Sequence, residues 1–540
     1  MPNYSSLSEI YEQFVNSKGW KSRVFIKKGL KALDEGINNQ EPTVVLLDLP
    51  TAYGKTTVTI SLADAIANHT KLINRIIHIL PMRSIADQLF NDIKERIGPK
   101  NQQLVALQHM GSPGSRFFTK KIIITTLDTF LLNFYKAPVA EIHRMFEYNE
   151  YSHFDFPRAM IYSSLIIFDE YHLFSPLGSL ENEAKSFTSA TYSVCTLATS
   201  GVPVIIMTAT MPLPLKQILI EKCENYGISI KPIQYEKFGD RDYEEDRKDK
   251  KICLEIIDEK DVKTEVEKFL SARKKVLLIF NTVKEAFKCF SNLSYYKPIL
   301  IHGKLPEITR VKRFEEFKNE TPPLMISTQV VESGLNLSFD VLITDACPAD
   351  RLIQRAGRVA RFKEHDEGVV YFLRRTNGPY PYDEDITKRT YEEISKKRGI
   401  SLSLDFYRQL LEKVYRDSKI EEQKNLWEAL YYLDLPLFDS KDARKAIETF
   451  NGFTDSFGII SGYMENALDP KMSVGLSEEE AFHVLKKKKK VVNPEMKIET
   501  VPDSFLYSSK GISLKLLSGG YVGIIVDDFD PENGYIGDIE

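Results

Sequence analysis

Residues 44–57 read VVLLDLPTAYGKTT, a run that joins an apolar strand, a turn and the start of a helix. This order is the context that a phosphate-binding loop requires. Backbone N–H groups at the helix start point toward phosphate oxygens, Lys55 supplies a positive charge to the β- and γ-phosphates, and the Thr56 hydroxyl can hold Mg²⁺. The candidate loop consists of Pro50, Thr51, Ala52, Tyr53, Gly54, Lys55, Thr56 and Thr57. We therefore expect ATP and Mg²⁺ to bind here.

Further apolar runs follow this loop, and helical patterns separate them. The first series of strand candidates lies at residues 76–80, 104–107, 121–125, 164–170 and 202–208, and the second at 275–280, 298–302, 323–328, 340–345 and 368–373. Alternation of buried strands with helices favours parallel sheets covered on both faces. The sequence thus predicts an α/β fold with two tandem parallel sheets.

Changes in pattern suggest where the domains divide. The stretch GDRDYEEDRKDKK contains almost no apolar residues and is typical of a linker or exposed loop. After residue 376 the pattern becomes mainly helical. We expect a first domain over 1–215 that includes N-terminal helices, a linker over 216–250, a second domain over 251–376 and a mostly helical accessory domain over 377–540.

Composition narrows the class of protein. The 540 residues are 43% hydrophobic and 27% charged, as in ordinary globular proteins. The five cysteines lie far apart without zinc-ligand spacing, and no leader or membrane-length apolar run is visible, so we expect a cytoplasmic protein. A net charge of −4 means that any nucleic-acid site must be a local groove. The basic run at 486–490 is typical of a solvated face.

Two acids follow the buried strand candidate in SLIIFDEYH. Asp169 and Glu170 stand where this strand would end, at the sheet edge that also presents the phosphate loop. Asp169 is a candidate Mg²⁺ ligand, and Glu170 is a candidate base for the water that attacks the γ-phosphate. A further strand candidate ends at Thr208-Ala209-Thr210, whose hydroxyls could link the acids to a bound strand.

The second series carries candidate partners for the same phosphate. Gln354, Arg358 and Arg361 recur at spacings of four and three, which predicts that they share one face of a helix. Guanidinium groups that reach in from a second domain stabilise the charge of a transferring phosphoryl group. We therefore expect the nucleotide to lie between the two domains.

These motifs, in this order, resemble those of superfamily 2 helicases of the DExH type. The segments TQVVESGLNLSFD and LIQRAGRVAR resemble in particular the CRISPR-associated type I interference helicase, over about residues 40–375. The resemblance implies two RecA-like domains, a coupling role for His172 beside Thr208 and Thr210, and an ATPase that moves 3′ to 5′ on single-stranded DNA. It also implies recruitment to a crRNA-guided surveillance complex. By motif position, the contacts with single-stranded DNA would come from Arg83, Thr125, Thr126 and Thr328.

The resemblance is incomplete at two places. The phosphate loop begins with Leu49-Pro50-Thr51-Ala52 where the family usually has Ala-Pro-Thr-Gly. Many family members also carry an N-terminal HD nuclease domain, whereas about 40 residues precede the loop here, so we expect the nuclease to be a separate subunit. His365-Asp366 is an HD dipeptide without other metal ligands nearby, and we interpret it as coincidental.

Two alternatives remain open at this point. A DExH RNA helicase or a restriction-type DNA motor subunit would carry a similar motif order. A catalytically silent scaffold that only binds nucleic acid or a protein is the alternative from another class, although the intact Lys55, Asp169, Glu170 and Arg361 argue against it.

Overall fold

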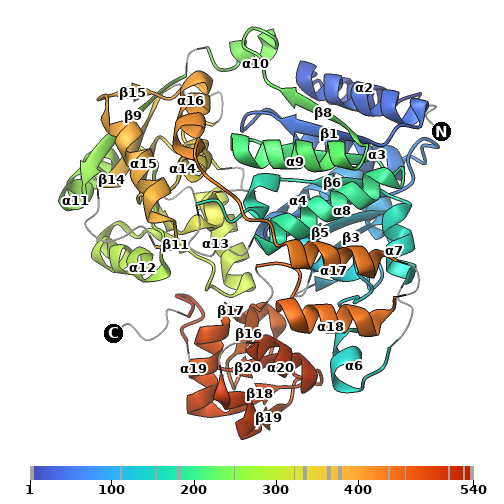
Figure 1. Cartoon of the computed structure of the whole chain (residues 1–540). Helices are drawn as coiled ribbons and strands as arrows, with labels where there is room; N and C mark the ends of the chain where they lie inside the picture. The colour runs from blue at the N-terminus through green and yellow to red at the C-terminus, as the bar shows by residue number, and fades with distance from the viewer. Residues whose placement is uncertain are drawn as a thin grey trace.

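The chain folds into two α/β domains and a smaller C-terminal sheet domain (Figure 1). The computed structural model describes residues 5–109, 112–151, 155–178, 184–248, 250–320, 323–332, 337–361, 367–374, 380–435, 438–455, 458–508, 511–526 and 529–535. The HD dipeptide at 365–366 lies outside these residues. Within the described residues, no helix has the length and apolar character needed to cross a membrane.

The first domain is built on an eight-stranded sheet with the order β4-β3-β5-β2-β6-β7-β1-β8. Its strands are β1 (Thr43–Asp48), β2 (Ile76–Leu80), β3 (Val105–His109), β4 (Ser112–Pro113), β5 (Ile122–Thr126), β6 (Leu165–Phe168), β7 (Val204–Thr208) and β8 (Ser229–Gln234). All pairs are parallel except β3 with β4. The central strands are buried along their length, because helices cover both faces.

Alternate strand residues enter two separate cores. Val45 and Leu47 pack against one helical layer, and Val44 and Leu46 against the other. The first layer consists of α1 (Leu7–Ser17), α2 (Val24–Asn39), α3 (Thr56–Ala67) and α4 (Arg83–Ile97). The second layer includes α5 (Leu127–Phe134), α6 (Ile142–Glu147), α7 (Asp155–Tyr162), α8 (Lys185–Thr199) and α9 (Leu213–Asn225).

The second domain repeats this plan with a seven-stranded sheet of order β11-β12-β10-β13-β14-β9-β15. Its strands are β9 (Lys251–Asp258), β10 (Val276–Ile279), β11 (Ile299–Ile301), β12 (Leu324–Ser327), β13 (Val341–Thr344), β14 (Glu367–Arg374) and β15 (Ile400–Ser401). Only the pairing of β15 with β9 is antiparallel among these described strands. Helices α11 (Val262–Ser271), α12 (Val283–Asn292), α13 (Glu307–Glu320) and α14 (Ala349–Ala356) cover it. The predicted α/β class with two parallel sheets is confirmed.

The boundary expected at 215 and the linker expected over 216–250 are wrong. Strand β8 pairs with β1 at the edge of the first sheet, and α9 packs on that domain through Leu219. Even the charged stretch is structured, because Asp240 caps α10 (Arg241–Glu245) and accepts a hydrogen bond from the Tyr53 hydroxyl in the phosphate loop. In the sequence the charged residues indicated a loop, whereas the structure has a short helix there, which a few buried side chains hold in place.

The expectation of one helical accessory domain over 377–540 is also wrong. Helices α15 (Glu384–Ser395) and α16 (Leu404–Tyr415) complete the core of the second domain, whereas α17 (Lys424–Asp434) and α18 (Ser440–Phe450) complete that of the first. Figure 1 shows α17 beside α8. Apolar helix faces indicate burial but do not identify the surface that buries them, so the sequence did not reveal this division.

The remaining C-terminal residues form a mixed sheet of order β17-β16-β20-β18-β19. Its elements are β16 (Ile460–Tyr463), β17 (Val474–Leu476), α19 (Glu478–Lys488), β18 (Lys490–Val492), β19 (Ile498–Thr500), α20 (Ile512–Ser518) and β20 (Gly523–Ile525). Helix α20 packs on α6 of the first domain, while the segment 529–535 lies on the second, where His302 Nε2 donates to Asn533 O at 3.0 Å. The basic run at 486–490 lies at the C-terminal end of α19, where positive charges interact favourably with the helix dipole.

We expect Leu430→Ala in α17 to destabilise the first domain. Leu430 is fully buried in the core of that domain, and such a truncation costs about 2–5 kcal/mol. Urea unfolding followed by tryptophan fluorescence measures this, because both tryptophans, Trp20 and Trp427, belong to this unit. The neighbouring exposed Tyr431→Ala is the control and should change the free energy of unfolding by less than about 1 kcal/mol. Equal stabilities of the two variants would contradict the assignment of α17 to the first domain.

Candidate functional site

The phosphate loop connects β1 to α3 at the carboxyl edge of the first sheet. Gly54 has φ +92° and Ala52 has φ +61°, so the backbone turns sharply before the helix. Lys55 is almost buried, and its ammonium group donates to Leu49 O at 2.8 Å and to Pro50 O at 3.3 Å. The Tyr53 side chain is fully buried on the side of Asp240, so only its backbone can face a phosphate. The loop can therefore cradle an anion, as expected for Lys55 and the helix start.

Asp169 and Glu170 follow β6 at the same edge. Asp169 Oδ1 accepts from the Glu170 backbone N–H at 2.9 Å, and Asp169 Oδ2 lies 3.4 Å from His78 Nε2 of β2. Burial raises the pKa of Asp169, but the His78 contact and the Lys55 charge outweigh it and hold that pKa below the ordinary value. The two acids therefore differ, and Asp169 is the one that stays ionised.

Glu170 is prepared for a different task. Burial and the Asp169 charge raise the pKa of Glu170 to about 7, against the opposing charges of Lys55, Arg358 and Arg351. Its Oε2 atom is buried and makes no hydrogen bond to the described residues, and its backbone has φ +47°. A carboxylate whose pKa is close to neutral and whose oxygen is open to a new partner has the properties of a general base.

His172 follows the two acids and contacts three polar side chains. Its Nδ1 lies 2.9 Å from Thr208 Oγ1, and its Nε2 lies 3.1 Å from Thr210 Oγ1 and 2.6 Å from Gln354 Nε2. With the Gln354 amide nitrogen facing the ring, Nε2 accepts its hydrogen bond, and the proton of the neutral ring lies on Nδ1, which donates to Thr208 Oγ1. Burial, with the charges of Arg351 and Lys55, holds the pKa of His172 well below its usual value, so the ring stays neutral.

This arrangement brings the predicted coupling residues together. Thr208 ends β7 and His172 lies in the short 3-10 helix Tyr171–Phe174 (η2), both in the first domain, while Gln354 reaches them from α14 of the second. One neutral ring thus joins the two domains beside the acid pair.

The expectation that Gln354, Arg358 and Arg361 share one helix is wrong. Helix α14 ends at Ala356, because the next residues pair with Phe339, whose N–H donates to Arg358 O at 2.9 Å. Both guanidinium groups nevertheless interact electrostatically with Glu170. Burial and the Arg361 charge lower the pKa of Arg358 to about 9, and the opposing attraction of Glu170 does not offset this. Two cations therefore face the candidate base from the second domain.

A glycine allows this turn to approach the phosphate loop. A Cβ atom on Gly357 would lie 3.1 Å from Thr51 Oγ1, closer than a side chain is normally tolerated. The arginine turn and the phosphate loop are therefore in contact across the interdomain cleft.

The support of this turn was not predicted from the sequence. Glu332 is buried and accepts from Arg355 Nε at 2.7 Å and from Arg351 Nη1 at 3.3 Å. Arg355 also donates to Thr344 Oγ1 of β13 at 2.7 Å, which ties α14 to the second sheet. An acid in the run TQVVESG was the available signal, but a buried partner cannot be identified from spacing alone.

The residues predicted to contact nucleic acid differ in their exposure to solvent. Thr125, Thr126 and Thr328 are buried, and the Thr125 hydroxyl donates to Gln108 O at 2.6 Å, so this hydroxyl is not presented to a phosphate. The reason is that β5 continues through Thr126 and draws both threonines into the sheet. Arg83 begins α4 and is partly exposed.

Arg310 of α13 was not predicted from the sequence as a candidate nucleic-acid contact. Its electrostatic partners include Asp87 and Arg83 of α4, so it faces α4 from the second domain. Burial lowers the pKa of Arg310, and the Asp87 charge opposes this. Arg83 and Arg310 therefore lie near each other on facing domains, together with Asp87, and they are candidates for contacting a phosphate backbone.

The donor set fits Mg²⁺ bound together with phosphate. Thr56 is exposed at the first position of α3, and Asp169 is the acid whose pKa is lowered. Among the described residues there is no cluster of three or more His, Cys, Asp or Glu that could hold a metal alone. Mg²⁺ characteristically takes one or two protein ligands and completes its shell with water and phosphate oxygens.

Comparisons with known proteins agree with this geometry. A family model described as DEAD/DEAH box helicase matches residues 31–218, and another described as CRISPR-associated nuclease/helicase Cas3, C-terminal, matches residues 272–364. A putative CRISPR-associated nuclease/helicase Cas3 of Methanocaldococcus jannaschii is 24% identical over 432 residues, covering 72% of this chain and 54% of that protein.

Two further similarities follow the same line. The CRISPR-associated helicase Cas3 of Thermoproteus tenax is 25% identical over 402 residues, covering 70% of this chain and 64% of that protein. The chain therefore spans between half and two thirds of the length of these curated relatives. The crystal structure of T. fusca Cas3-AMPPNP matches the fold with a TM-score of 0.60 at 15% identity, over 92% of this chain and 70% of that one.

We expect Lys55→Ala and Glu170→Gln each to lower the rate of ATP hydrolysis by orders of magnitude. Loss of Lys55 removes the charge that holds the phosphates, and loss of a general base typically lowers the rate by about 10²- to 10⁴-fold. A phosphate-release assay measures both effects. The exposed Lys100→Ala in the same domain is the control. Turnover of either site variant at the parent rate would refute the site assignment.

The pKa of Glu170 predicts a pH dependence. Because a base must be ionised to accept a proton and burial raises this pKa to about 7, kcat/KM for ATP should fall about tenfold per pH unit below pH 7 and level off above it. Initial rates over pH 5.5–8.5 measure the profile. The residual activity of Glu170→Gln should lack this limb, and an identical limb in that variant would assign the titration to another group.

Proposed function

We propose that this chain, a DEAD/DEAH box helicase core related to the CRISPR-associated Cas3 helicases, is an ATP-driven motor that moves along single-stranded DNA. The observation that carries the proposal is the contact of Gln354 with His172, beside Glu170 and opposite Arg358 and Arg361. It gives the second domain direct access to the residues that would sense and hydrolyse a nucleotide.

In the proposed reaction, the protein positions ATP and manages one proton. The Lys55 ammonium group and the N–H groups at the start of α3 hold the β- and γ-phosphates. Mg²⁺, held by Thr56 and Asp169, would neutralise phosphate charge when bound. Glu170 takes the proton of the water whose oxygen bonds to the γ-phosphorus as the bond to ADP breaks. Arg358 and Arg361 stabilise the charge that spreads over the transferring group.

Coupling to movement follows from the shared network. When the γ-phosphate leaves, Arg358 and Arg361 lose their anionic partner, and the contact of Gln354 with His172 no longer has support from the nucleotide. The second domain can then move relative to the first, and with it Arg310 relative to Arg83. Alternating grip by these two cations on the phosphates would move the strand.

We further propose the biological setting from the names of the relatives. They support a CRISPR-associated role, and a similar solved structure is named as a CRISPR RNA-guided surveillance complex. On this basis we propose action in CRISPR interference, in the cytoplasm, with recruitment to a crRNA-guided surveillance complex. We propose 3′ to 5′ movement and a separate HD-domain nuclease subunit from the resemblance of the motifs alone. Adding an HD nuclease and ATP to a strand-separated target should then give degradation that neither protein alone produces.

An RNA helicase or a restriction-type motor subunit remains the alternative. Arg83 and Arg310 can contact phosphates, which DNA and RNA share, so these residues do not distinguish the sugar.

We expect ATP hydrolysis to be stimulated more strongly by poly-dT than by poly-U. In Arg361→Ala the stimulated rate should fall by about 10³-fold or more, because an arginine that faces the transferring phosphate typically contributes this much. The exposed Arg374→Ala on β14 is a matched control and should retain the parent rate. Stronger stimulation by poly-U would overturn the DNA assignment, and an unaffected Arg361→Ala would remove this arginine from the mechanism.

A further inference from the structure

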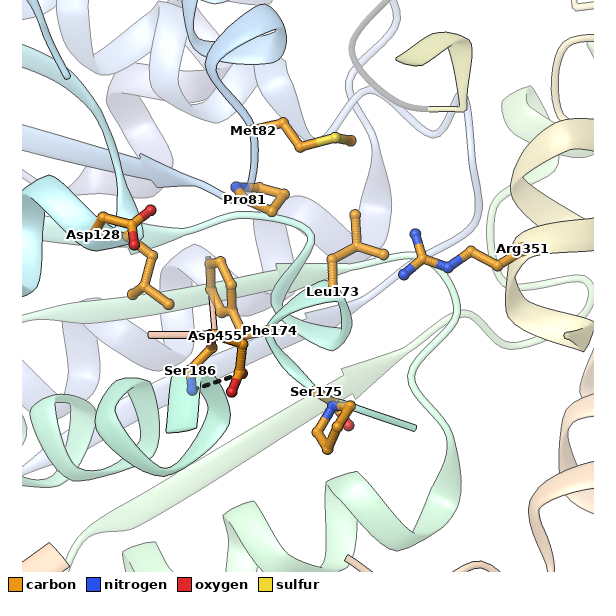
Figure 2. Close-up of a pocket in the computed structure, with 11 residues that line it drawn as sticks. Pro81, Met82, Asp128, Leu173, Phe174, Ser175, Ser186, Arg351 and Asp455 are labelled. Carbon is orange, nitrogen blue, oxygen red and sulfur yellow. Dashed lines mark hydrogen bonds between the residues drawn. The ribbon is translucent and has the colours of Figure 1, made fainter. Parts of the chain in front are cut away.

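A cavity of about 240 Å³ lies beside the catalytic cleft, at the carboxyl edge of the first sheet (Figure 2). It is formed where β2 and β6 end, α5 begins and the loop after α18 passes over them. None of the proposed steps of ATP hydrolysis uses it.

The cavity has an apolar part and a polar part, and four side chains form much of the apolar part. These are Met82, Leu127, Leu173 and Phe174. The Phe174 ring is fixed by an edge contact with Tyr171 at 5.5 Å, and Phe174 and Leu127 belong to the buried core. The cavity therefore offers a rigid apolar surface, which suits a flat apolar ligand.

One side of the cavity carries two carboxylates. The Asp455 carboxylate accepts the backbone N–H groups of Lys185 at 3.2 Å and Ser186 at 3.0 Å, and Asp128 accepts from the Thr454 hydroxyl. Fixed carboxylates of this kind repel a phosphate and attract N–H donors. A phosphate group is therefore a poor occupant of this end.

Positive charge lies on the other side. Figure 2 shows Arg351 of α14 reaching the cavity from the side opposite Asp128 and Asp455. Met82, which lines the cavity, immediately precedes Arg83 at the start of α4. A ligand here would have an apolar flat body, an N–H edge at the carboxylates and an anionic link toward Arg351.

We propose that this cavity holds one unstacked nucleobase of the bound single strand. The inference rests on the proposed function and specifies where the strand is held. The base lies against Phe174 and Met82 and donates N–H to Asp128, while its phosphates lie toward the Arg351 side of the cavity. A nucleobase has these two flat faces and a donor edge, and stacking on an aromatic ring tolerates any sequence.

Abasic scanning tests this proposal. A set of single-stranded oligonucleotides, each lacking one base at a successive position, is titrated against the full chain by fluorescence anisotropy. One register should bind about 5- to 100-fold more weakly than the others, because a single stacked base contributes about that much to affinity. In each oligonucleotide the fluorescent end is blocked by a bound protein, and this block sets the position at which the chain binds the strand.

Leu173→Trp fills the cavity and is the test variant. Leu173 is only partly buried, so the larger ring can occupy the space without entering the core. The weak register should disappear in this variant. The matched control is Leu72→Trp, an exposed site before β2 at the opposite edge of the sheet, which should keep the weak register. Thermal melting of both variants establishes that they are folded.

The outcomes separate the two proposals. Binding with a flat profile in the parent chain, or a weak register that survives Leu173→Trp, overturns the base site and leaves the motor unaffected. Absence of any single-strand binding overturns both. A cavity that instead takes an aromatic side chain of a partner protein would give the flat profile.

Discussion

The hydrogen bond between the buried, neutral His172 ring and Gln354 is the interaction on which the proposed coupling of the two domains depends. A charged His172 ring would carry a proton on Nε2, and it would then repel the Gln354 amide group at 2.6 Å instead of accepting its hydrogen bond. Complete burial and the surrounding cations keep the ring uncharged. The direction of this hydrogen bond, with its donor in the second domain and its acceptor in the first, therefore follows from the environment of the His172 ring.

The same environment separates the two neighbouring acids. Asp169 has a histidine contact and stays ionised, whereas Glu170 has an oxygen without a hydrogen bond to the described residues and a pKa near neutrality. Burial without pairing is unfavourable in an ordinary core and is found where a group must accept a new partner. The guanidinium groups of Arg358 and Arg361 interact with Glu170 from the second domain, and Arg358 Nη2 also donates to the backbone carbonyl of Glu332 at 2.6 Å.

The sequence predicted the parts of this structure that have local signals. The apolar runs before Pro50 and Asp169 predicted strands, and parallel strands of this fold present their carboxyl ends at one edge. It did not predict where side chains from distant elements meet. The helix expected to continue through Arg361 ends at Ala356, because the backbone of the following residues pairs with Phe339. The Thr125 hydroxyl donates to a backbone carbonyl within the sheet and is therefore not presented to a phosphate. Arg310 was not predicted as a nucleic-acid contact, because only its position beside Arg83 in the folded protein indicates this role.

The path of the chain between the domains has a mechanical consequence. The polypeptide crosses from the first domain to the second after α10, near residues 246–250, and returns between α16 and α17, at residues 416–423. These two tethers, together with the C-terminal unit that contacts both domains, leave the two bodies little freedom to slide apart, but the tethers permit rotation about the line that joins them. The opening of the cleft should therefore be a pivot with a defined axis, and the length of these two connectors sets how far it can swing.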